Sequence, residues 1–243
     1  MRTHFEWEGL ETPQQIVHKQ VECPLNIQDL RDLFAKTQKR QLADYIQKDR
    51  KQSFSFSQAP VMRFALFQLG EADYQFIWTY HHILLDGRSR FLILQEFFAL
   101  YAAYCQNQAL DLPQPYPYQD YIDWLQHQDL SKSKTFWQQQ LNGVQTPTPL
   151  IKGWVKDLID EQPTYADKIL HLSETMTTAL QSLAKYNDLT LNTLVQGAYA
   201  ILLSRYSQEE TIIFGAARAC RYWTDIEPKS RIGLFTLMHP FNA

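Results

Sequence analysis

Two neighbouring segments of the chain, residues 61–69 and 73–80, have the patterns of β-strands. The first (VMRFALFQL) places apolar residues on both of its faces, which is typical of a strand in the middle of a sheet covered on both sides. The second (DYQFIWTY) is rich in aromatic and β-branched residues. Gly70-Glu71-Ala72 lies between them, so we expect a hairpin.

After this strand pair, apolar residues recur at helical spacing from Arg88 to Gln106. Further helices are predicted at Asn26 to Lys51, 118–128 and 131–142. Near the start of the chain, residues 3–23 predict two strands joined by a turn at Thr12-Pro13.

The second half of the chain predicts two helices with polar N-caps. Ser173 and Thr190 precede the helical patterns and are the expected capping residues. The helix after Thr190 (LNTLVQGAYAILLSRY) is apolar almost all round, so we expect it to be buried. The strands expected on either side of this helix pair are Asp167 to Leu172 and Thr211 to Ala217.

A break in the pattern at Asn142 to Pro149 (NGVQTPTP) predicts a division of the chain into two subdomains. Glycine and proline stop the preceding helix there, and the segment is typical of a linker. We therefore expect a first subdomain over 1–142, a linker over 143–165 and a second subdomain over 166–243.

Composition narrows the class of protein. The 243 residues are 45% hydrophobic and 14% aromatic, enough to fill a core, and the net charge of −3 argues against a nucleic-acid partner or an anionic membrane surface. No apolar run reaches membrane-spanning length. The three cysteines are far apart and form no metal-ligand pattern, so we expect reduced thiols in a cytoplasmic protein.

The segment with candidate chemistry is Tyr80 to Gly87 (YHHILLDG), between a predicted strand and a predicted helix. If the strand continues through the histidines, His82 and His81 lie on opposite faces and cannot easily ligate one metal ion. No H-x-x-x-H or C-x-x-C accompanies them, which disfavours zinc. His82 lies close to the start of the predicted helix, and a helix N-terminus disfavours the positively charged imidazolium. The neutral imidazole can accept a proton, so His82 fits a general base. A hydrogen-bonded core histidine is the alternative for either residue.

Asp86 and Gly87 follow the histidines and have their own interpretations. Asp86 either orients a histidine, as in serine hydrolases, or caps the helix or pairs with an arginine to hold the turn. The second role is favoured because Ile83-Leu84-Leu85 separates Asp86 from His82. Gly87 is expected to allow a tight turn that a side chain would block. Ser89 lacks a G-x-S-x-G context, so we disfavour a Ser–His–Asp triad.

At this motif a family resemblance becomes specific: HHILLDG resembles the HHxxxDG signature of the condensation domains of nonribosomal peptide synthetases, in the chloramphenicol-acetyltransferase-like superfamily. Other segments agree in order and spacing: Arg2-Thr3-His4-Phe5 (RTxF), Tyr118 to Trp124 (YxDYxxW), Phe136 to Gly143 with Pro147 to Leu150 (FWxxxLxG and PTPL), and Leu189 to Tyr206 with Phe214-Gly215-Ala216. The resemblance covers essentially the whole chain.

The resemblance implies a fold and a function. The fold is α/β (layered α+β), a mixed sheet with flanking helices in two subdomains. The activity is acyltransferase-type amide formation between aminoacyl or peptidyl thioesters held on the phosphopantetheine arms of donor and acceptor carrier domains, alongside adenylation domains and with no cofactor bound directly. His82 is then the catalytic histidine, His81 is structural, and Asp86 is a structural carboxylate with Arg2 as a candidate partner. Gly87 lies against the reacting centre.

The chain departs from the family pattern at both ends. The family's first motif is absent before Arg2, and Arg231 to Pro240 only begins like the (V/I)GxFxNT segment. We therefore expect the middle of a condensation domain, with an incomplete second subdomain, and expect the chain alone to be inactive or poorly folded. The alternatives are a carrier-dependent O-acyltransferase of the same superfamily and a non-catalytic remnant or docking fragment.

Overall fold

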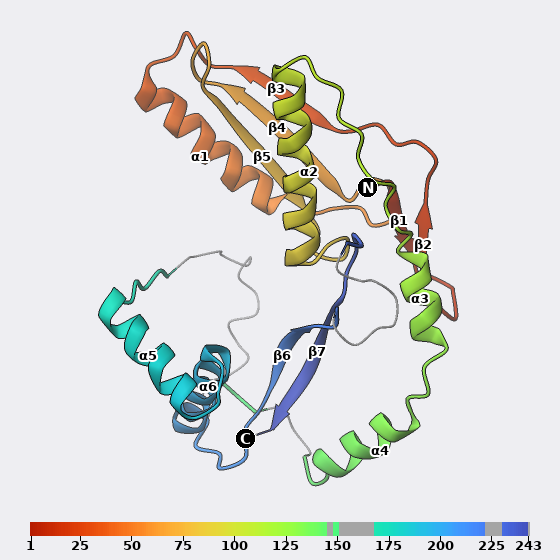
Figure 1. Cartoon of the computed structure of the whole chain (residues 1–243), viewed down its shortest axis with the longest axis vertical. Coiled ribbons are helices and arrows are strands. Elements are labelled where there is room, and N and C mark those ends of the chain that lie inside the picture. The colour runs from red at the N-terminus through yellow and green to blue at the C-terminus, as the bar shows by residue number, and fades with distance from the viewer. Residues whose placement is uncertain (145–147, 151–167, 222–229, 243) are drawn as a thin grey trace. The chain divides into compact units, whose positions relative to one another are not determined.

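The computed structural model describes residues 1–144, 148–150, 168–221 and 230–242, which form two compact units (Figure 1). The first unit comprises Met1–Gln126 with Cys220–Thr236, and the second comprises His127–Ala219 with Leu237–Ala243. The division falls after Gln126 rather than at residue 142, and the chain returns to the first unit near its end. Most of the predicted linker over 143–165 lies outside the described residues.

A three-stranded mixed sheet forms the centre of the first unit. Its strands lie in the order β3 (Leu25–Asp29), β4 (Met62–Gln68) and β5 (Tyr74–Tyr80). β3 runs parallel to β4, and β5 runs antiparallel to β4 after the expected hairpin. The mixed sheet is confirmed, and so is the central position of β4.

Helices cover both faces of β4 because its side chains alternate between two apolar clusters. Ala65 and Phe67 face α1 (Ala35–Lys51), where Tyr45 meets Phe67 edge-on at 5.0 Å. Met62 and the partly buried Phe64 belong to the other cluster, together with Ile93 of α2 (Gly87–Cys105). A strand buried on both faces reads as a continuous apolar run, which is the pattern seen in its sequence.

The expected helix from Asn26 is wrong over its first residues. Residues 25–29 form β3, and α1 begins only at Ala35. The Phe64 N–H donates to the Pro24 carbonyl at 2.9 Å, and the Leu30 N–H donates to the Gln68 carbonyl at 2.9 Å. Pairing with a long-range partner strand thus outweighs the local helical pattern.

The remaining elements of the first unit are a hairpin and a short helix. β1 (Thr3–Glu6) and β2 (Gln14–Val17) pair antiparallel, as expected for residues 3–23. α3 (Gln119–Gln126) follows the proline-rich stretch and buries Tyr121.

The second unit contains the expected helices with the expected caps. They are α4 (Ser131–Gln140), α5 (Glu174–Tyr186) and α6 (Leu191–Ser207), and a two-stranded sheet pairs β6 (Ile213–Ala219) with β7 (Thr236–Asn242). The Ser173 hydroxyl accepts the Met176 N–H at 3.2 Å, and the Thr190 hydroxyl accepts the Thr193 N–H at 3.1 Å. Both capping predictions are confirmed.

Two expectations for the second unit are wrong. Residues 168–172 form no strand, and Ile169 and Leu170 are exposed because no described strand pairs with them. α6 is not buried all round, since Val195 and Ile201 are more than half exposed. Among the described residues α6 buries only one side, around Ala200 and Leu203.

Candidate active site

The two histidines lie on a turn, not in a strand. β5 ends at Tyr80, and the Leu84 N–H then donates to the His81 carbonyl at 3.1 Å. The His81 N–H donates back to the Val61 carbonyl at 3.1 Å, which ties the turn to the start of β4. Strand alternation therefore does not set the directions of the two imidazoles; the turn does.

His81 is the partly buried member of the pair. Its Nδ1 accepts the Ile83 N–H at 3.1 Å, so the ring is held in the neutral tautomer that carries its proton on Nε2. Phe56 meets the ring edge-on, with centroids 4.6 Å apart. Burial, and to a smaller extent the neighbouring His82 imidazole, lower the pKa of His81.

His82 is the exposed member of the pair. Within the part of the chain that the structure describes, no hydrogen bond or ion pair engages its imidazole. Its backbone carbonyl accepts the Leu85 N–H at 3.3 Å, so the backbone is held while the ring is open to solvent. This is the arrangement expected of a group that exchanges protons with a substrate, whereas His81 has the contacts of a structural histidine.

Asp86 caps α2 from a buried position. Its carboxylate is 2% exposed, and Oδ1 accepts the Ser89 N–H at 2.8 Å. Burial alone would raise its pKa, but the hydrogen bonds from Arg221 and Ser89 outweigh burial and hold the pKa of Asp86 below its ordinary value. The carboxylate is therefore ionised at neutral pH.

Arg221, not Arg2, is the partner of Asp86. The Arg221 Nη2 and Nε donate to the two carboxylate oxygens at 2.8 and 3.1 Å, a bidentate ion pair whose arginine is 4% exposed. Arg2 instead donates to the Lys19 carbonyl, across the β1–β2 hairpin. The prediction of Arg2 rested on its place in a motif, whereas the pairing depends on a residue 135 positions after Asp86 that no local pattern indicates.

Ser89 is buried beside this ion pair and makes several hydrogen bonds of its own. Its hydroxyl donates to the Gly233 carbonyl at 2.7 Å and accepts the Gly233 N–H at 2.9 Å and an Arg221 N–H at 2.6 Å. A hydroxyl with these three bonds is saturated, which leaves no role for Ser89 as a nucleophile. The Ser89 hydroxyl therefore joins the first turn of α2 to Gly233 and Arg221.

Residues 230–236, here the closing segment, complete the cluster. The Phe235 N–H donates to Asp86 Oδ2 at 3.2 Å, and its ring lies 4.1 Å from the Arg221 guanidinium. Gly233 packs so closely on the Tyr118 ring that an added Cβ would overlap it. Arg231 joins α3 through a 2.7 Å bond to Asp120. Local sequence patterns do not indicate these partners because their bonds to Asp86, Ser89 and α3 span more than 100 residues.

Gly87 differs from the expectation. It is the first residue of α2, and an added Cβ would meet nothing within 4 Å. The backbone turn itself therefore does not exclude a side chain here. The open space lies on the exposed side of the helix start.

A metal centre finds no support in the part of the chain that the structure describes. Among those residues no three His, Cys, Asp or Glu side chains are placed to hold a metal ion. In the same residues, no helix combines the length and apolar character needed to cross a bilayer.

The turn thus presents one exposed imidazole beside a helix capped by a buried Asp–Arg ion pair, on an α/β fold. The whole sequence, residues 1–243, matches the family described as "Condensation domain". The chain therefore belongs to the condensation-domain family.

Curated relatives place the chain among modules of peptide synthetases. It is 43% identical to a component of the linear gramicidin synthase of Brevibacillus parabrevis, over 91% of this chain and 4% of that protein. It is 31% identical to tyrocidine synthase 2 of the same organism over 100% of this chain and 7% of that protein. The chain thus spans only a small part of these long relatives.

Solved structures show the same fold. The first condensation domain of the calcium-dependent antibiotic synthetase superposes with a TM-score of 0.70 at 16% identity, over 99% of this chain and 56% of that one. The epimerization domain from the third module of tyrocidine synthetase B gives a TM-score of 0.74 at 18% identity, over 99% and 54%. The chain thus spans about half the length of these solved domains.

Proposed function

We propose that this chain supplies the histidine-bearing half of a condensation site that joins two carrier-tethered substrates through an amide bond. The observation that carries the proposal is the His82 imidazole, exposed and unpartnered among the described residues, on a turn tied to β4 and to α2, in a chain of the condensation-domain family. The substrates would be aminoacyl or peptidyl thioesters on phosphopantetheine arms, with adenylation domains loading the carriers. No cofactor bound directly is required.

The reaction needs one proton transfer that His82 can perform. The acceptor's α-amine attacks the donor thioester carbonyl, a C–N bond forms, and the C–S bond breaks to release the carrier thiol. The attacking nitrogen must lose a proton, which His82 accepts as the tetrahedral intermediate forms and can return to the leaving thiolate. A free α-amine has a pKa near ~8, so part of the acceptor is already neutral at pH 7.

The size of the His82 contribution is bounded by this chemistry. General base catalysis by a positioned side chain accounts for about 10²–10⁴ in rate. The rest of the acceleration would come from holding two tethered substrates in reacting geometry.

The remaining site residues then have supporting roles. His81, neutral and bonded to the Ile83 N–H, shapes the turn. Asp86 serves as a structural carboxylate because its oxygens are occupied by Arg221, Ser89 and Phe235 rather than by a histidine. Among the described residues, no contact between Asp86 and His82 supports a role for Asp86 as a proton relay.

The test is product formation by the full-length protein with purified carrier domains. One carrier is loaded in turn with each of the twenty aminoacyl thioesters as donor. The other carries either glycyl thioester, which offers an amine, or hydroxyacetyl thioester, which offers a hydroxyl, as acceptor. Mass spectrometry of the carrier-bound product distinguishes an amide, an ester on a hydroxyl acceptor, or neither.

His82→Ala should lower the rate of amide formation by about 10²–10⁴. His171→Ala, which removes an exposed histidine of the second unit, is the matched control and should leave the rate unchanged. Amide formation by His82→Ala at the wild-type rate would contradict the base role. An ester product alone would support the O-acyltransferase alternative, and no product from the wild type would support a non-catalytic fragment.

A further inference from the structure

Two phenylalanines of the segment after α1 meet the His81 ring edge-on. Phe56 does so with centroids 4.6 Å apart and planes at 86°, and Phe54 with centroids 6.5 Å apart and planes at 81°. Both belong to residues 52–57, here the aromatic segment (QSFSFS), which lies outside the sheet and outside the helices. Two apolar rings therefore lie against His81.

The aromatic segment is itself fastened from β4. The Arg63 guanidinium lies 4.2 Å over the Phe54 ring, and its Nη2 donates to the Gln52 carbonyl at 3.0 Å. Arg63 is held in turn by a salt bridge to the buried Asp49, whose other oxygen accepts the Thr79 hydroxyl at 2.6 Å. One end of the segment is therefore anchored to both β4 and β5.

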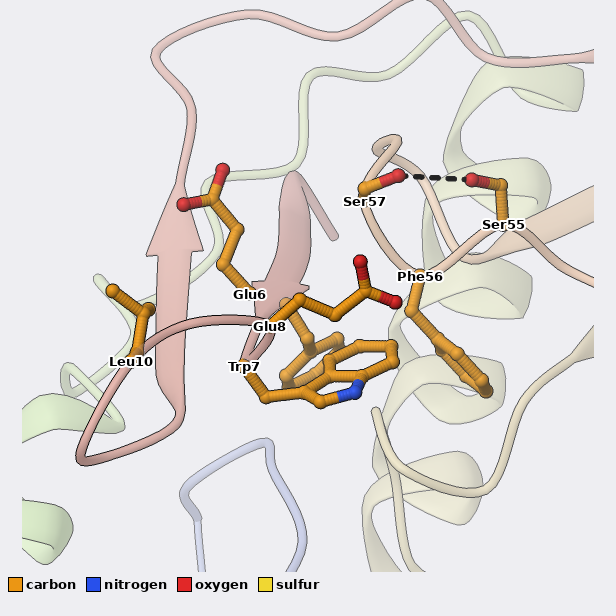
Figure 2. A pocket seen from close by; sticks show the side chains of 8 residues that line it. Glu6, Trp7, Glu8, Leu10, Ser55, Phe56 and Ser57 are labelled. Atoms are coloured by element: carbon orange, nitrogen blue, oxygen red, sulfur yellow. Dashed lines mark hydrogen bonds between the residues drawn. The ribbon is translucent and has the colours of Figure 1, made fainter.

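The hairpin fastens the other end. The Phe5 N–H donates to the Phe56 carbonyl at 2.8 Å, and the Trp7 ring contacts Phe56 edge-on at 5.6 Å. Figure 2 shows this side of Phe56, which lines a cavity of about 430 Å³ beside Trp7, and the 3.1 Å bond between the Ser55 and Ser57 hydroxyls. Phe56 thus stands between this hairpin and the His81 ring.

We propose that Phe54 and Phe56 form an aromatic clamp that positions the His81–Leu84 turn, and with it His82, for the condensation reaction. This inference rests on the proposed function. Phe56 is the principal positioning residue because its ring is closer to His81. The clamp acts on His82 only through His81 and the backbone of the turn, so neither phenylalanine touches the reacting groups.

The clamp has a chemical consequence for His81. The Ile83 N–H can be accepted only by an unprotonated Nδ1, so a protonated ring would lose the bond that shapes the turn. The phenyl rings of Phe54 and Phe56 offer no hydrogen-bond acceptor that could replace water around an imidazolium, and the lowered pKa of His81 agrees with this burial. Among the described residues, the titratable group that acts on the His81 ring is His82 on the same turn. The aromatic segment contributes phenyl rings, the residue before β4 contributes the Val61 carbonyl, and the Arg63 cation lies over the Phe54 ring.

The direction of the pH effect follows from the lowered pKa. The turn is intact while His81 is neutral, and the stability of this arrangement decreases as the pH falls from about 6.5, the ordinary value, through the folded pKa. Removing Phe56 exposes the ring to water and moves the folded pKa back up. The acid limb of the rate profile should therefore shift to higher pH in such a variant.

The experiment compares Phe56→Leu, Phe56→Tyr and Phe67→Leu in the full-length protein with loaded carrier domains. Phe67 is a fully buried phenylalanine of the opposite cluster and serves as the matched control for lost stability. Phe56→Leu should lower kcat about 10- to 100-fold with little change in KM, because a displacement near 1 Å at the reacting groups has an effect of this size. Phe56→Tyr keeps the ring edge and should restore most of kcat, and Phe67→Leu should leave kcat unchanged.

A second measurement does not depend on turnover. In protein labelled with ¹⁵N-histidine, the His81 signals, assigned by their loss in His81→Gln, report the tautomer and the pKa of the ring. Wild type should show the Nε2–H tautomer and a pKa below the ordinary value, and the pKa should rise in Phe56→Leu. An ordinary wild-type pKa, or kcat unaffected in a folded Phe56→Leu, would overturn the clamp. Loss of activity in His82→Ala together with an unperturbed His81 would leave the proposed function standing without it.

Discussion

The buried cluster around Asp86 and the turn that carries His82 lie within a few residues of each other but differ in almost every physical respect. Asp86, Ser89 and Arg221 are at most 4% exposed, and their hydrogen bonds are made to one another and to the closing segment. His82 is exposed, and within the described residues its ring has no partner. The first region is buried and closed by hydrogen bonds, whereas the second leaves an imidazole open to solvent.

The difference shows how an exposed imidazole can lie on a turn whose backbone is held at both ends. A buried ion pair is costly unless its remaining polar atoms are bonded, and here the backbone N–H groups of Ser89 and Phe235 and the Ser89 hydroxyl satisfy them. That cluster fixes the start of α2, while His81 fixes the end of β5. The turn between them is held at both ends, so His82 needs no side-chain partner of its own.

The largest effect expected is from Arg221→Met. The Asp86 carboxylate would remain buried without its counter-ion, which should lower the free energy of unfolding by about 3–5 kcal/mol. Urea unfolding followed by tryptophan fluorescence measures the change. Arg31→Met is the matched control, since its bonds to both oxygens of Asp29 and to Glu71 are exposed and should contribute little to stability. Equal losses in the two variants would contradict the distinction drawn between buried and exposed pairs.

A smaller effect is expected from Gly233→Ala. The added methyl group would overlap the Tyr118 ring, and the closing segment would have to shift, at a cost of about 1–3 kcal/mol in stability. Gly197→Ala, in the interior of α6 with open space around it, should instead stabilise the protein by about 0.5–1 kcal/mol. Thermal and urea unfolding of both variants test the opposite signs; a neutral Gly233→Ala would mean that the segment packs less tightly than described.

The smallest stability effect is expected from His82→Ala. An exposed side chain without a partner can be removed with a change within about 0.5 kcal/mol, although the same substitution should abolish most of the activity. The free energy of unfolding, measured beside the amide-forming rate, separates the two effects. A marked loss of stability would show that His82 belongs to the structural cluster after all.

Local patterns predicted most elements of the fold. The strand pair ending at Tyr80, the long helix after Gly87 and the Ser173 and Thr190 caps all follow from residues within a few positions of each other. The failures involve distant partners: β3 depends on pairing with β4, and the exposure of α6 depends on which described elements pack against it. The wrong partner for Asp86 has the same origin.

The sequence by itself determined the family, most of the helices and strands, and the short motif in which two histidines, an aspartate and a glycine lie between a strand and a helix. Only the tertiary structure decided which histidine is confined and which is free, and which arginine neutralises Asp86. The physical reason is the separation along the chain over which each kind of interaction acts. Capping, periodicity and turn formation act between neighbours in the chain. Burial, ion pairing and ring contacts depend on segments that folding brings together from distant parts of the chain, as with Phe56 and His81, or with Asp86 and Arg221, which are 135 positions apart.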